Sequence, residues 1–132
     1  MGLGIWRKRG AVNDKAFLIN QQILQAAYQA FNLRDLDGAL AFMHADVDWA
    51  NGMTGGRVRG RAAVQRYWAE QWAVIDPHVE PVDFTLDETG RMVVNVHQVV
   101  RDRNGNTLVD QMVQHVYWIE DGLIRQMEIG QE

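Results

Sequence analysis

The chain contains four histidines and no cysteine, so imidazole is its best-suited side chain for proton transfer near neutral pH. His44, His78, His97 and His115 lie on different predicted elements, and no HExxH pair occurs. The sequence therefore predicts no metal site and no thiolate chemistry. His115 lies among valines and is the best candidate for proton transfer. A histidine that orients a ligand or packs in the core is the alternative.

The first half of the chain has the periodicity of helices. Apolar residues recur every three or four positions over residues 15–33, which predicts an amphipathic helix. Asp35 is placed to cap a short second helix. A third helix is expected to begin after Gly60 and to end at Asp76–Pro77.

The second half alternates as strands do. Two short strands are expected at 46–51 and 57–59, and four longer ones follow at 79–86, 92–100, 108–119 and 123–129. Helices followed by a meander predict an α+β fold, with three helices packed on a curved antiparallel sheet that encloses a pocket.

The length, charge and hydropathy of the chain limit which classes of protein it can belong to. The chain has 132 residues, of which 1–14 are expected to form a flexible lead-in and 15–132 a single domain. A net charge of −4 argues against nucleic acid as a partner. No apolar run reaches the length of a membrane span, and no signal peptide is evident. We therefore expect a cytoplasmic protein that needs no cofactor.

The hairpin around Asn104–Gly105 sets which side chains share a face. A two-residue turn there places His115 opposite Val94, and a shift of one residue would exchange the two faces. The inner face then carries His115 with Gln98 and Gln111 among valines. Convergent polar groups in an apolar wall are typical of a ligand site. The alternative is that they bond to one another or to ordered water.

The opposite face of the same hairpin is also apolar. It would expose Met112, Val116 and Trp118 if nothing covered it. We therefore expect a homodimer formed through this outer sheet face.

Three segments together resemble a known superfamily. They are YQAFNLRDLDGALAFMHADVDWANG (28–52), RGRAAVQRYWAEQW (59–72) and VDQMVQHVYWIEDGLIRQMEI (109–129). They are similar to the nuclear transport factor 2-like superfamily, in particular its ketosteroid isomerase and SnoaL-like polyketide cyclase branch. The resemblance implies a cone of helices on a curved sheet, an internal cavity and a sheet-mediated dimer. It does not imply one reaction, because this fold hosts many.

At the positions that the resemblance assigns to the catalytic residues of ketosteroid isomerases, this chain has other residue types. The resemblance places Asn51 where those enzymes have their basic aspartate, and an amide cannot act as that base. Ala27 falls at the position of their tyrosine, with Tyr28 next to it. His115 replaces their protonated aspartic acid.

Polyketide cyclases of this fold pair a histidine with an aspartate on the last strand. His115 matches the histidine, but Ile129 falls at the position of the acid. The neighbouring Glu128 faces away from His115 if the Asp121–Gly122 turn carries a glycine bulge, and faces it otherwise. Both arrangements remain open from the sequence.

These observations lead to two hypotheses about function. The first is a cofactor-independent isomerase, cyclase or hydratase acting on a small hydrophobic compound, with His115 as acid or base. The second is a noncatalytic binding or sensor module. The expected catalytic residues are His115, Asn51 and Tyr28. The expected ligand-binding residues are Trp49, Trp68, Trp72, Val96, Gln98, Gln111, Val113, Tyr117 and Met127.

Overall fold

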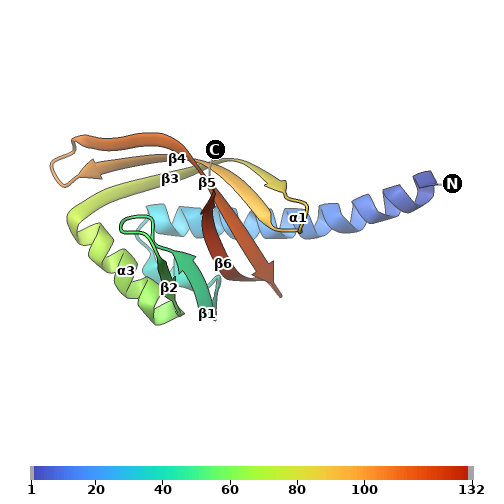
Figure 1. Cartoon of the computed structure of the whole chain (residues 1–132), viewed down its shortest axis with the longest axis horizontal. Helices are drawn as coiled ribbons and strands as arrows, with labels where there is room; N and C mark the ends of the chain where they lie inside the picture. Colours follow the sequence, from blue (N-terminus) through green and yellow to red (C-terminus); the bar gives the residue numbers. More distant parts are fainter. Residues whose placement is uncertain (1, 131–132) are drawn as a thin grey trace.

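The first helix, α1 (Gly2–Asn32), is longer than the sequence predicted. The computed structural model describes residues 2–130, with side chains from Lys15 onward. The C-terminal part of α1 lies beneath the sheet, and its N-terminal part extends beyond it (Figure 1). Extending an existing helix needs no new nucleus, so the helix continues past the amphipathic stretch that periodicity detects. The flexibility expected for residues 1–14 stays a prediction.

A tight connection leads from α1 into the short helix α2 (Leu36–Leu40). Arg34 adopts a left-handed conformation, with φ 62°, and ends α1. The carboxylate of Asp35 accepts a hydrogen bond of 3.0 Å from the backbone N–H of Gly38, which confirms the predicted cap. A β-carbon on Gly38 would lie 2.2 Å from that carboxylate, so the close approach requires glycine here.

Six strands form one curved sheet in the order β2-β1-β6-β5-β4-β3. The helix α3 (Arg61–Val74) follows β2 and leads directly into β3 (Figure 1). All pairings are antiparallel except β1 with β6, so the expectation of a purely antiparallel sheet was wrong at this one pairing. The strands are β1 (Met43–Ala50), β2 (Arg57–Arg59), β3 (Ile75–Leu86), β4 (Met92–Asp102), β5 (Thr107–Glu120) and β6 (Leu123–Gly130).

The β4–β5 hairpin has the predicted register, but a different turn produces it. Asp102 and Asn106 close the turn, so its loop has three residues rather than two. An irregularity leaves Leu108 without a partner, because Val100 pairs with Val109 and Arg101 with Thr107. The extra residue compensates for the longer loop, and His115 pairs with Val94 as predicted.

The β5–β6 hairpin decides where Glu128 points. Asp121 and Gly122, with φ 52° and 78°, form a two-residue turn without a glycine bulge. A register shift occurs further along, because Trp118 pairs with Gln126 and Ile119 with Ile124, which leaves Arg125 as the extra residue. Ile129 therefore lies opposite His115, and Glu128 pairs with Val116 on the outer face.

The core lies between the helices and the concave face of the sheet. Its largest fully buried side chains are Leu24, Met43, Val47, Val64, Met92, Val94, Val96 and Ile124. Phe31 contacts both Trp68 and Trp72 edge to face, with ring centroids 5.2 Å apart in each pair. These aromatic contacts join α1 to α3. Within the described residues, no helix is long and apolar enough to cross a membrane.

Candidate functional site

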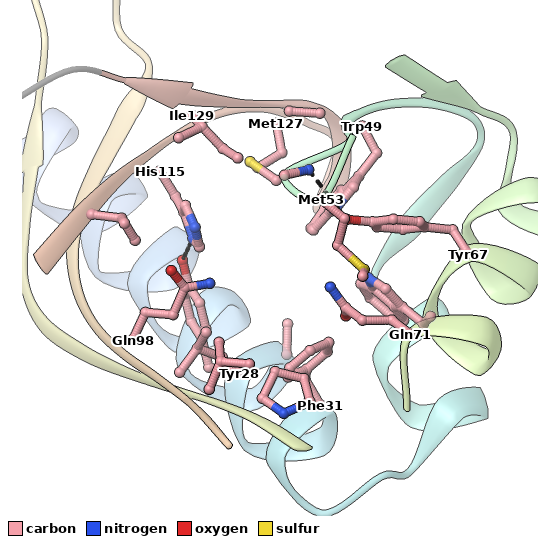
Figure 2. Close-up of a pocket in the computed structure, with 18 of the residues that line it drawn as sticks. Tyr28, Phe31, Trp49, Met53, Tyr67, Gln71, Gln98, His115, Met127 and Ile129 are labelled. Atoms are coloured by element: carbon pink, nitrogen blue, oxygen red, sulfur yellow. Dashed lines mark hydrogen bonds between the residues drawn. The ribbon is translucent and has the colours of Figure 1, made fainter. Parts of the chain in front are cut away.

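A cavity of about 390 Å³ lies between the helices and the inner face of the sheet (Figure 2). This volume falls within the usual range of small-molecule sites. Nine of the twelve predicted site residues line it: Tyr28, Trp49, Trp68, Gln98, Gln111, Val113, His115, Tyr117 and Met127. These nine residues come from the helices α1 and α3 and from four strands of the sheet, namely β1, β4, β5 and β6.

His115 is held by a chain of two tyrosines. The Tyr28 hydroxyl lies 2.7 Å from His115 Nδ1, and the Tyr117 hydroxyl donates to the Tyr28 oxygen at 2.7 Å. The rings of Tyr28 and His115 are nearly parallel, with an interplanar angle of 7°. Tyr117 lies two residues after His115 on β5, and Tyr28 comes from α1. The contact that positions the imidazole is therefore tertiary.

The buried surroundings keep these three groups uncharged at neutral pH. Burial lowers the pKa of His115 to about 4, because the imidazolium loses its hydration. Burial also raises the pKa of Tyr28 and that of Tyr117 well above the ordinary range of tyrosine. The network therefore consists of neutral donors and acceptors.

The second ring nitrogen of His115 faces the cavity. Among the described residues, Trp72 Nε1 is the only buried side-chain nitrogen or oxygen without a hydrogen-bond partner. His115 Nε2 has no hydrogen-bond partner among the described residues and is not among these buried atoms, so it has accessible surface, and His115 lines the cavity. If Tyr28 donates to Nδ1, the neutral imidazole carries its proton on Nε2. Such an arrangement presents an N–H donor to a bound molecule.

Three predicted site residues do not line the cavity. Asn51 Oδ1 accepts hydrogen bonds of 3.0 Å from the N–H groups of Met53 and Thr54, so it caps the loop after β1. Trp72 packs behind Trp68 with the Arg34 guanidinium 5.2 Å from its ring. Val96 is fully buried in the core. Burial and loop capping account for these positions, and the sequence does not distinguish them from a cavity wall.

Among the residues that the structure describes, no carboxylate is bonded to His115. Glu128 lies on the outer face and forms an ion pair of 3.2 Å with Arg91. None of the residues that line the cavity is Asp, Glu, Lys or Arg. Within the described part of the chain, no group of three His, Cys, Asp or Glu side chains could hold a metal ion. The site therefore offers neutral hydrogen bonding rather than a histidine–carboxylate dyad.

The cavity also has lining residues that the sequence analysis did not identify as site residues. Phe31, Tyr67, Gln71 and Met53 all face it (Figure 2). The hydroxyl of Tyr67 accepts a hydrogen bond of 3.1 Å from Gly52 N–H. That contact fastens the loop of residues 51–56 beside the cavity. Helical spacing from Trp68 could have indicated Gln71, but nothing local indicated Met53.

The family model of the SnoaL-like domain matches residues 24–127. The chain belongs to this family. The membership agrees with the cone of helices on a curved sheet and with the cavity between them. It confirms the resemblance seen in the three sequence segments, but not a particular reaction.

Solved structures with the same fold support this membership. TerC, crystallised with polyporic acid, is 26% identical with a TM-score of 0.75, and the match covers 86% of this chain and 92% of TerC. A nuclear transport factor 2-like protein from Burkholderia pseudomallei is 28% identical, with a TM-score of 0.74 and coverages of 86% and 91%. A candidate polyketide cyclase from Xanthomonas campestris is 25% identical, with a TM-score of 0.71 and coverages of 88% and 92%. No curated protein matches the sequence.

Proposed function

We propose that this protein binds a small, flat hydrophobic compound through a carbonyl or enol oxygen, which accepts a hydrogen bond from His115 Nε2–H. The observation that carries the proposal is the Tyr117–Tyr28–His115 chain at the wall of an otherwise apolar cavity. A donor that faces the cavity, with no partner among the described residues, gains a hydrogen bond when a ligand oxygen reaches it. TerC, a relative of the same fold, was crystallised with polyporic acid.

The preference for a flat ligand follows from the aromatic walls. Trp49 and Trp68 meet at right angles with ring centroids 5.5 Å apart, and Tyr117 lies 6.1 Å from Trp49. Together with Phe31 they line the cavity with rigid rings. Aromatic faces contribute dispersion and stacking to a planar molecule, and less to a branched aliphatic one.

Catalysis is the second candidate, and one observation favours it. An N–H donor directed at a carbonyl oxygen can stabilise the negative charge that develops there during enolisation, as oxyanion donors do. His115 would then act as an electrophilic donor and not as a base, because a pKa of about 4 makes its imidazole a weak proton acceptor. An isomerase, cyclase or hydratase that polarises a carbonyl is consistent with this role.

The experiment is a titration of flavone, a flat and uncharged carbonyl compound, into the purified protein, followed by quenching of tryptophan fluorescence. We expect the unmodified protein to bind it and the His115→Phe variant to bind roughly 5- to 10-fold more weakly, because one hydrogen bond is lost. His97→Phe is the matched control, since His97 lies on the outer face and pairs with Asp110. Equal affinity of His115→Phe and the unmodified protein would contradict the role of His115.

The same samples distinguish binding from catalysis. Mass spectrometry of the ligand after incubation reveals whether its mass or retention time has changed. A change with the unmodified protein, abolished in His115→Phe, supports catalysis. An unchanged ligand supports the noncatalytic binding module.

We also propose that two copies associate through the outer face of β4 and β5. Met112 and Trp118 are exposed there, and Val116 is half-buried beside them. Association would remove this apolar surface from water. Sedimentation at micromolar concentration should give a dimer, and the double variant Met112→Lys/Trp118→Lys should give a monomer. A monomer from the unmodified protein would disprove this interface.

A further inference from the structure

Three glutamines from three different elements line the cavity away from the tyrosine–histidine chain. They are Gln71 on α3, Gln98 on β4 and Gln111 on β5. Figure 2 shows the amides of Gln71 and Gln98 projecting into the cavity. Gln111 Nε2 donates to Gln98 Oε1 at 3.0 Å, across the paired strands.

This pair leaves hydrogen-bonding capacity unused. Each glutamine amide has two N–H donors and an oxygen with two acceptor sites. The bond between them uses one donor of Gln111 and one acceptor site of Gln98. Among the described residues, neither amide makes another side-chain hydrogen bond, and that of Gln71 makes none. The amide pair therefore offers both a donor and an acceptor to a bound molecule.

The amide pair lies at a distance from His115. Gln111 precedes His115 by four residues on β5, which corresponds to about 13 Å along an extended strand. The pair Val96–Val113 lies between the two polar positions. Gln111 is exposed and Gln98 half-buried, whereas His115 is buried, so the amides lie nearer to solvent. The cavity thus has an inner polar end, an apolar middle and an outer polar end.

We propose that the ligand carries a second oxygen, an uncharged hydroxyl, at the end remote from the oxygen held by His115, and that Gln98 and Gln111 bind it. This inference rests on the proposed function and adds the chemical class of the ligand's other end. A hydroxyl both donates and accepts one hydrogen bond, which matches the unused capacity of the amide pair. A carboxylate does not match, because none of the described residues that line the cavity carries a cationic side chain to offset its desolvation.

The test uses two planar probes that differ by one hydroxyl, flavone and 4′-hydroxyflavone. Each has a carbonyl at one end, and the second has a hydroxyl at the other. Calorimetric titration at pH 6 keeps that phenol uncharged. We expect the unmodified protein to bind 4′-hydroxyflavone roughly 10-fold more tightly than flavone, since the added hydroxyl satisfies otherwise unpaired amide groups.

The double variant Gln98→Leu/Gln111→Leu should lose this discrimination. Its affinity for 4′-hydroxyflavone should fall to that of flavone, and flavone should bind no more weakly than before. Gln114→Leu is the matched control, because Gln114 lies on the same strand but on the outer face, bonded to Asn95. Its discrimination should equal that of the unmodified protein.

The outcomes separate the two proposals. Equal binding of the two flavones by the unmodified protein, or discrimination that survives in the double variant, would overturn the role of the glutamines and leave that of His115 intact. Loss of flavone binding in His115→Phe supports the proposed function independently of the glutamines. If neither flavone binds the unmodified protein, both proposals fail together.

Discussion

The two faces of the β4–β5 hairpin have opposite chemistry. The inner face carries neutral groups, with His115 and Tyr117 in a hydrogen-bonded chain among valines. The outer face carries a charge-bearing pair, with His97 Nε2 2.7 Å from a carboxylate oxygen of Asp110. Each face thus contains a histidine with an oxygen partner, but only the outer partner is acidic.

The difference shows that strand register determines the chemistry of the site more than composition does. Acidic residues are plentiful near the site in sequence, and Glu128 is adjacent to the residue opposite His115. One extra residue, Arg125, directs that carboxylate outward. The inner face therefore lacks a charge partner for its imidazole.

Deleting Arg125 should have the largest effect, because it removes this separation of the two faces. Met127 would turn outward and Glu128 inward, which loses apolar burial and brings a carboxylate into the core. We expect more than about 4 kcal/mol of destabilisation, enough to unfold much of a marginally stable domain. Urea unfolding followed by circular dichroism measures it. Arg125→Ala preserves the residue count and should change stability by less than about 1 kcal/mol.

Tryptophans on the two sides of the sheet provide the next comparison, because Trp68 lies on α3, on the cavity side, and Trp118 lies on the outer face of β5. Trp68 is 4% exposed and packs against Trp49 and Phe31, whereas Trp118 on the outer face is 38% exposed. Trp68→Ala should cost about 3–5 kcal/mol of unfolding free energy through the cavity it creates. Trp118→Ala should cost less than about 1 kcal/mol when both variants are compared at a protein concentration at which sedimentation shows a monomer. Similar losses for both would contradict the assignment of inner and outer faces.

The buried histidine of the inner face, His115, should couple the stability of the fold to pH. The pKa of His115 is about 4 in the folded state and about 6.5 when unfolded, so the unfolded state binds the proton more tightly. The contribution of neutral His115 to the free energy of unfolding is complete above about pH 6.5. As the pH falls towards 4, the free energy of unfolding decreases by up to about 3 kcal/mol. His115→Gln should flatten this part of the profile measured by urea unfolding. His97→Gln should retain it.

Adding a carboxylate to the inner face should have the smallest effect on the free energy of unfolding. Its main effect should be on the pKa of His115. Ile129 is 43% exposed and lies opposite His115, so Ile129→Asp places an acid beside the imidazole at modest cost. The negative charge should raise the pKa of His115 by roughly 1 unit or more from its value of about 4. Chemical shifts of the ring protons against pH measure it. Ile129→Asn is the isosteric control. An equal pKa of His115 in both variants would contradict the proximity of the side chain at position 129 to the imidazole.

The sequence alone determined the features that depend on short-range order. Alternation along 92–100 and 108–119 predicted both faces of the hairpin, and Asp35 before a short apolar stretch predicted a helix cap that the structure confirms. The three motif-bearing segments predicted the family. The strand faces and the helix cap depend on residues a few positions apart, where side-chain direction follows directly from backbone geometry.

Only the tertiary structure decided which groups meet. Leu108 and Arg125 shift the register of their strands, and no local pattern marks either position. Tyr28 reaches His115 across 87 residues of sequence, and Asn51 turns into its own loop instead of the cavity. Such contacts are set by how helices and sheet pack together, where a single extra residue reverses the direction of every side chain that follows.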